Sequence, residues 1–106
     1  MIVNYASAKV SEPAPGVTRK ILAYSPKLML IEHSLDKGST LPEHRHPHEQ
    51  LGYMISGALL LEIEGREFKT VAGDSFVIPG DVPHKVTALE NSVVLDVFTP
   101  AREDYL

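Results

Sequence analysis

The sequence predicts an all-β fold, a closed antiparallel barrel or jelly roll. Short apolar segments rich in β-branched residues are separated by glycine- and proline-containing turns. Over residues 58–64, Leu59, Leu61 and Ile63 alternate with more polar neighbours, the pattern of a strand with one buried face. No segment has the apolar spacing of a helix of ordinary length, and no internal repeat is present.

The composition sets the limits within which this fold must form. A length of 106 residues predicts one domain over residues 1–106, with a barrel core at about 17–100 and an N-terminal arm at 1–16. At 43% hydrophobic residues the chain can bury a small core. The net charge of −4 argues against nucleic acid as the main partner. The lack of cysteine excludes a disulfide framework, a cysteine zinc finger and a thiol nucleophile.

No targeting or membrane segment is visible in the sequence. The first residues lack the basic start and apolar run of a signal peptide. No apolar run is long enough to span a bilayer. We therefore expect a cytoplasmic protein that does not bind a membrane.

The first third of the chain predicts an arm followed by two strands. The arm over residues 1–16 ends in a turn-rich segment, SEPAPG, and is expected either to be extended or to pair with a neighbouring chain. Strands are predicted over residues 17–24 and 27–35, with a break at Ser25-Pro26 between them. Residues 36–38 then turn the chain.

The remaining strands are likewise separated by turn signals in the sequence. Glu64-Gly65-Arg66 is a tight hairpin signal, Gly73-Asp74 marks another turn, and residues 79–84 form a proline-rich loop. Strands are predicted over residues 50–55, 58–64, 67–71, 75–78, 84–88 and 92–99.

The segment between Gly38 and Gly57 contains the most informative polar pattern. His44, His46 and His48 occupy every second position, and Gln50 follows in the same register. Because a strand sends alternate side chains to one face, an extended segment would bring His44, His46 and Gln50 together inside the barrel. Imidazole nitrogens and an amide oxygen at one point suit a divalent metal, with Zn, Ni, Mn, Fe and Co all compatible.

Other interpretations of these histidines stay open at this point. The segment could be a solvated loop with incidental metal affinity. His48 is interpreted as a residue at the rim or as a hydrogen-bond partner of a ligand, with direct ligation the less favoured alternative. His33, within IEHSL, is expected at the surface or in packing.

Two motifs in this chain resemble those of the cupins. The first cupin motif, G-x5-H-x-H-x3-E-x6-G, corresponds to Gly38, His44, His46, Gln50 in the glutamate position, and Gly57. The second, G-x5-P-x-G-x2-H-x3-N, corresponds to Gly73, Pro79 and His84, with Asp81 where glycine is usual and Ala88 where asparagine is usual. The resemblance implies a jelly roll of six to eight strands.

A narrower resemblance is to the KdgF family of pectin-degradation cupins. It is carried by GVTRKILA near the start, HRHPHEQLGYMISG in the middle and VVLDVFTPAREDYL at the end. The resemblance implies conversion of 4,5-unsaturated monouronates, released from pectin or alginate, to the linear 5-keto-4-deoxyuronate. It also implies metal ligands at His44, His46, Gln50 and His84, and catalytic residues at Asp96, Phe98 and Arg102.

The chemistry of these residues agrees with those roles. Asp96 lies in an apolar run, where a charged group is costly unless it is paired or functional. A cavity-facing Asp96 suits general acid–base catalysis, and Arg102 suits a substrate carboxylate held by two parallel hydrogen bonds. A neutral glutamine ligand leaves the metal its full charge and makes it a stronger Lewis acid. Structural roles remain open, with Asp96 paired to an arginine (Arg19 or Arg102), Phe98 in the core and Arg102 at the surface.

The sequence thus favours a metal-dependent enzyme that acts on a small sugar acid and forms a homodimer through its sheet edges. Two other function classes are weighed against it. One is a cupin dioxygenase that uses Fe and O2. The other is a non-catalytic module that binds a sugar or a metal, because a fold does not fix a function.

Overall fold

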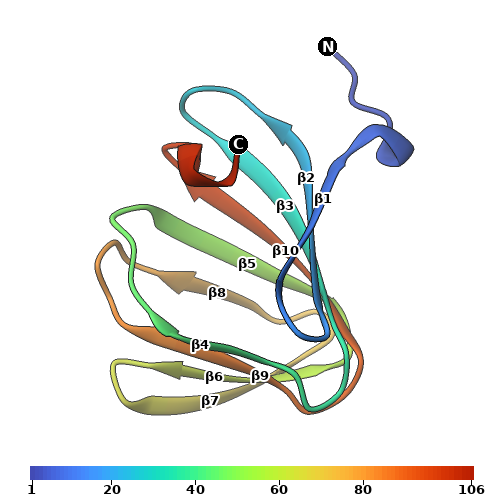
Figure 1. Ribbon diagram of the computed structural model, residues 1–106. Helices are drawn as coiled ribbons and strands as arrows, with labels where there is room; N and C mark the ends of the chain where they lie inside the picture. Colours follow the sequence, from blue (N-terminus) through green and yellow to red (C-terminus); the bar gives the residue numbers. More distant parts are fainter.

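The computed structural model describes residues 1–106, which form two antiparallel sheets facing each other (Figure 1). The larger sheet has the order β1-β2-β3-β10-β5-β8 and the smaller β4-β9-β6-β7. The strands are β1 (Lys9–Ala14), β2 (Val17–Tyr24), β3 (Met29–Leu35), β4 (Thr40–His44), β5 (Glu49–Ser56), β6 (Ala58–Ile63), β7 (Arg66–Val71), β8 (Ser75–Ile78), β9 (His84–Ala88) and β10 (Ser92–Thr99). The predicted all-β class is confirmed, with ten strands in place of six to eight.

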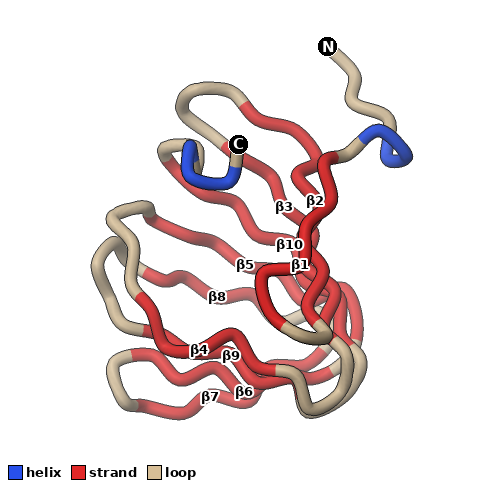
Figure 2. Tube along the Cα trace, in the orientation of Figure 1, coloured by secondary structure: helices blue, strands red, loops and turns tan.

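Helical structure is confined to the two ends of the chain (Figure 2). The short 3-10 helices η1 (Tyr5–Ser7) and η2 (Glu103–Tyr105) precede β1 and follow β10. Neither has the length or the apolar character needed to cross a membrane.

The N-terminal arm is part of the larger sheet. β1 pairs with β2 of its own chain, with Lys9 opposite Ile21 and Ser11 opposite Arg19. The arm was expected to be extended or to pair with a neighbouring chain. Because β2 offers a free edge in the same chain, residues 9–14 take that edge and become the outermost strand.

The histidine segment is not one continuous strand, which corrects the prediction from its alternation. β4 ends at His44, irregular backbone follows, and Gln50 belongs to β5 in the other sheet. Pro47 has no N–H to donate to a ladder, and a register irregularity between Leu41 and His44 already disturbs the pairing of β4. The segment therefore crosses from the smaller to the larger sheet.

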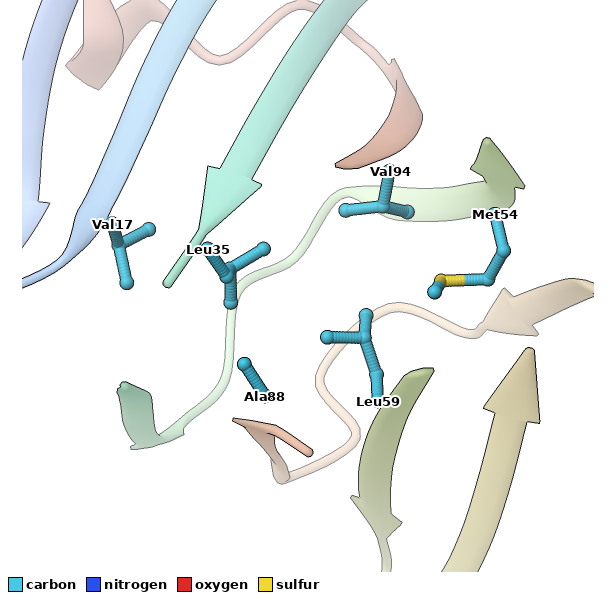
Figure 3. Close-up of a cluster of buried hydrophobic side chains, with 6 residues drawn as sticks. All are labelled: Val17, Leu35, Met54, Leu59, Ala88 and Val94. Atoms are coloured by element: carbon cyan, nitrogen blue, oxygen red, sulfur yellow. The ribbon is translucent and has the colours of Figure 1, made fainter. Parts of the chain in front are cut away.

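The core fills the space between the sheets. One buried cluster combines side chains from both sheets: Val17, Leu35, Met54, Leu59, Ala88 and Val94 (Figure 3). A second cluster consists of Ile21, Met29, Ile31, Phe98 and Ala101. In β10 alternate residues point inward, so Asp96 lies between Val94 of the first cluster and Phe98 of the second. An acidic side chain buried where the two apolar clusters meet is the first structural indication of a functional site.

Candidate metal centre

Three histidines from separate parts of the chain meet at one end of the barrel. His44 ends β4 and lies opposite His84, the first residue of β9, while His46 follows in the crossing segment. One ring nitrogen from each lies within 4.8 Å of the others. His46 and His84 are buried, whereas His44 is exposed. The sequence predicted that these three side chains converge, and they do so from different elements.

Main-chain carbonyls fix the orientation of all three rings. A carbonyl oxygen accepts hydrogen bonds and never donates them, so each Nδ1 beside one must carry the proton. The carbonyls of Pro42, His48 and Val82 lie 2.8, 3.0 and 2.8 Å from Nδ1 of His44, His46 and His84. Each Nε2 is therefore left with a free lone pair. His48 contributes its carbonyl to this arrangement and is outside the three-histidine cluster.

Gln50 adds an oxygen to these nitrogens. Its Oε1 lies 3.2 Å from Nε2 of His46, and its Nε2 donates to Oδ1 of Asp96 at 2.9 Å. Two atoms with lone pairs, an imidazole nitrogen and an amide oxygen, thus face each other. This is unfavourable unless a cation lies between them, and the donor set fits a divalent transition metal.

Burial keeps the inner two histidines in the form that binds metal. Burial, with further contributions from the charges of Arg102 and His84, lowers the pKa of His46 to about 4. Burial also lowers the pKa of His84. Since only the neutral imidazole coordinates a metal, both rings are ready to bind at neutral pH.

The loop before β9 supports the segment that carries His46. The N–H of Asp81 donates to the carbonyl of His46 at 2.7 Å. A Cβ on Gly80 would lie 2.4 Å from the carbonyl oxygen of Pro47, so only glycine allows this approach. Asp81 has φ +63°, the left-handed conformation that explains why glycine is usual at this position. Aspartate tolerates that region better than most residues.

Asp96 is buried and both of its oxygens accept hydrogen bonds. Oδ1 accepts from Gln50, and Oδ2 lies 2.7 Å from Nδ1 of His33. Arg19 donates from Nε to Nε2 of His33 at 3.1 Å. The hydrogen-bonded partners of Asp96 are therefore Gln50 and His33, and neither Arg19 nor Arg102 pairs with it directly.

His33 makes a polar contact that the sequence did not predict. It was expected at the surface or in packing; it is buried, as a packing position requires, and it also contacts Asp96. A signal was available, because His33 shares the alternation of Met29, Ile31 and Leu35, all buried in β3. The pairing of β3 with β10, which brings His33 to Asp96, could not be deduced from that alternation.

A cavity between the sheets connects these groups. Its polar lining is Arg19, His33, His44, Gln50, His84 and Asp96. Phe98 and Tyr105 also line it, together with apolar side chains of both sheets. The polar groups of the cavity and the histidine cluster thus form one continuous site.

Arg102 is buried, and part of its guanidinium is already hydrogen-bonded within the chain. Its Nε and Nη2 donate to Asp104 at 3.0 and 2.7 Å, and its Nη1 is buried without a partner. The two parallel bonds expected toward a substrate carboxylate are thus made to Asp104. The guanidinium carbons of Arg19 and Arg102 lie 3.6 and 4.1 Å from the ring centre of Tyr105. Burial lowers the pKa of Arg19 and raises that of Tyr105.

Comparison with known proteins identifies the family. A cupin domain matches residues 31–98. The pectin degradation protein KdgF of Dickeya dadantii (strain 3937) is 34% identical over 97 residues, which cover 90% of this chain and 88% of that protein. The chain belongs to the KdgF family of cupins. The resemblance deduced from the motifs is thereby confirmed.

Solved structures of cupins agree with this assignment. KdgF from Halomonas sp. is 36% identical to this KdgF-family cupin, with a TM-score of 0.92 and coverage of 100% of this chain and 98% of that one. An RmlC-like cupin from Shewanella frigidimarina is 28% identical, also with a TM-score of 0.92, over 99% of this chain and 95% of that one. The backbone around the candidate site therefore follows a known cupin arrangement throughout.

Proposed function

We propose that this cupin is a metal-dependent enzyme that opens the ring of 4,5-unsaturated monouronates from pectin or alginate, giving the linear 5-keto-4-deoxyuronate. The observation that carries the proposal is a buried carboxylate, Asp96, hydrogen-bonded to the amide of Gln50, whose oxygen faces the histidine cluster. This arrangement supports a proton-transfer role for Asp96 beside a candidate metal centre. The similarity to a protein named for pectin degradation supports the choice of substrate.

The metal would be held by His44, His46, His84 and Gln50, one ion per chain. Nickel, zinc, manganese, iron and cobalt all suit these ligands. When bound, the ion would supply a Lewis acid that stabilises negative charge on an oxygen of the opening ring.

Asp96 would move the proton. As a carboxylate it accepts the proton of the hydroxyl group on carbon 1; the bond between carbon 1 and the ring oxygen then breaks, leaving an aldehyde at carbon 1 and an enolate at carbon 5. The proton returns to carbon 4, and the enolate becomes the ketone at carbon 5. Substrate and product are isomers, so the step requires no oxidant, reductant or water.

Phe98 and Arg102 would orient the sugar acid. Phe98 lines the cavity and would bound one face of the sugar. The partner-free Nη1 of Arg102 would donate to the substrate carboxylate, since its other donors are held by Asp104. This assigns Arg102 one hydrogen bond to the substrate instead of two.

The test is turnover of unsaturated galacturonate, generated with a lyase and mixed with metal-loaded protein. We expect the absorbance of the conjugated double bond to fall and the open-chain ketone to accumulate in the NMR spectrum. Loss of absorbance no faster than in buffer would contradict the proposal. Oxygen uptake by the iron-loaded protein would favour a dioxygenase, and sugar binding without turnover would favour a binding module.

Gln50→Glu is expected to tighten metal binding and to slow turnover. The added charge strengthens attraction to the metal but weakens its Lewis acidity. A glutamate would also replace the amide that donates to Asp96 at 2.9 Å, so the two carboxylates would share a proton. Turnover should then fall by about 10²-fold, the lower range of acid–base catalysis. Metal affinity from calorimetry and turnover in the same samples check this, and faster turnover would contradict it.

We also propose a homodimer in the cytoplasm. β1 lies at an edge of the larger sheet, so its outward N–H and C=O groups have no partner in the chain and can pair with a second copy. Leu51, Tyr53 and Val77 add exposed apolar surface on the same sheet. Light scattering at micromolar concentration should give the mass of two chains, and a clean monomer would contradict the proposal.

A further inference from the structure

We propose that His33, held in a single tautomer by Arg19, is a positioning residue that orients Asp96 for proton transfer. This inference rests on the proposed function, in which Asp96 carries the proton. It assigns a role to a buried side chain, His33, and to a half-buried one, Arg19, that neither the cupin motifs nor the proposed mechanism uses.

The four polar side chains form a row across neighbouring strands. Arg19 lies on β2, His33 on β3, Asp96 on β10 and Gln50 on β5, and these strands are consecutive in the larger sheet. Each side chain is hydrogen-bonded to the next, at 3.1, 2.7 and 2.9 Å in that order. The row begins at the guanidinium of Arg19, which lies over the ring of Tyr105, and ends at the side-chain amide of Gln50, whose oxygen faces the histidine cluster.

The direction of each hydrogen bond follows from the chemistry of Arg19. Arginine only donates, so Nε2 of His33 must accept and carries no proton. The ring proton then resides on Nδ1, which donates to Oδ2 of Asp96. The hydrogen bond made by one ring nitrogen thus determines whether the other nitrogen carries the proton.

The consequence is a carboxylate fixed at both oxygens. His33 holds Oδ2 and Gln50 holds Oδ1, so the carboxylate cannot rotate without losing a hydrogen bond. His33 and Asp96 are only 4% and 3% exposed, and water does not replace a lost partner easily. Proton transfer requires accurate placement, and a displacement of about 1 Å costs roughly 10²-fold in rate.

Two amide substitutions separate positioning from general stability. In His33→Asn the side-chain nitrogen reaches the place of Nδ1 and can still donate to Asp96. In His33→Gln the same amide group extends to the place of Nε2 and leaves Asp96 without that donor. We expect His33→Asn to keep most of kcat, and His33→Gln to lose about 10²-fold in kcat with little change in KM.

The two variants are compared as turnover per folded molecule beside a melting curve. Equal kcat in both variants would overturn the positioning role. So would a lower melting temperature with turnover unchanged in His33→Gln, because that is the result of a purely structural histidine.

The hydrogen-bond chain is tested without substrate. In a long-range proton–nitrogen NMR spectrum of ¹⁵N-labelled wild-type protein, His33 should show a protonated Nδ1 and an unprotonated Nε2. The His33→Asn spectrum identifies the signals by their loss. A proton on Nε2, alone or with Nδ1 also protonated, would overturn the inference even if the protein opens uronates. If the spectrum shows the expected tautomer but the protein does not turn over uronate, the proposed function is rejected. The hydrogen-bond chain Arg19–His33–Asp96 is then still supported.

Discussion

Asp96→Asn should lower the turnover of unsaturated galacturonate by roughly 10²- to 10⁴-fold, the usual contribution of general acid–base catalysis. The amide has nearly the shape of the carboxylate but cannot accept and return the proton. Metal content should not change, because the asparagine oxygen can still accept a hydrogen bond from Gln50.

The same substitution should also cost some stability. Both oxygens of Asp96 accept hydrogen bonds, so the NH2 group of asparagine must face either Gln50 or the N–H of His33. One buried donor left unpaired costs about 1–3 kcal/mol, which should appear as a lower melting temperature. Turnover per folded molecule separates the two effects, and Asp36→Asn, an exposed aspartate outside the cavity lining, is the control. An Asp96→Asn variant that melts early but turns over normally would reject the catalytic role.

His84→Ala or His44→Ala should remove most of the metal affinity. Loss of a group that merely orients a metal ligand weakens binding by roughly 10- to 100-fold, and loss of a ligand should exceed that. A metal that binds only the folded chain stabilises it by about 2.7 kcal/mol when its free concentration is 100 times Kd. Chelation should therefore lower the melting temperature of the wild type and leave the two variants nearly unchanged.

Elemental analysis and melting curves with and without a chelator check this. His48→Ala is the matched control, because His48 orients His46 through its main-chain carbonyl and not its side chain. That variant should keep its metal. Untreated wild-type protein that contains no transition metal, with a melting curve that added nickel, zinc or manganese does not move, would contradict the metal centre.

Much of the fold could be predicted from local sequence signals, namely the apolar patterns and the turn residues. The strands over residues 17–24, 75–78 and 92–99 begin and end as predicted, and a strand begins at His84 as predicted, since glycine, proline or serine lies at each of these ends. The hairpin at Glu64-Gly65 has φ +50° and +76°, the turn that best joins two twisted strands. The pairing of β1 with its own β2 was not predictable, because edge pairing depends on which partner is nearest in space.

The candidate site, like the fold, was predictable from the sequence only in part. The resemblance to the two cupin motifs implied that His44, His46 and His84 converge, and they do. The single extended strand first expected to bring His44, His46 and Gln50 together is wrong. Side-chain networks depend on strand register, which is set by pairing across the sheet and not by local sequence. For that reason the contact of His33 with Asp96 could be found only in the structure. The hydrogen bonds from Arg102 to Asp104, two residues further along, lie outside the strands and depend on the fold of the C-terminal segment.

The most direct test of the account is a metal titration of the metal-stripped protein, followed by the loss of double-bond absorbance from unsaturated galacturonate. Separate series with nickel, zinc and manganese cover the ions that the ligand set allows. We expect little turnover without metal, and a rate that rises until one ion is bound per chain and then stays constant. Metal-stripped protein that opens the ring as fast as loaded protein would contradict it.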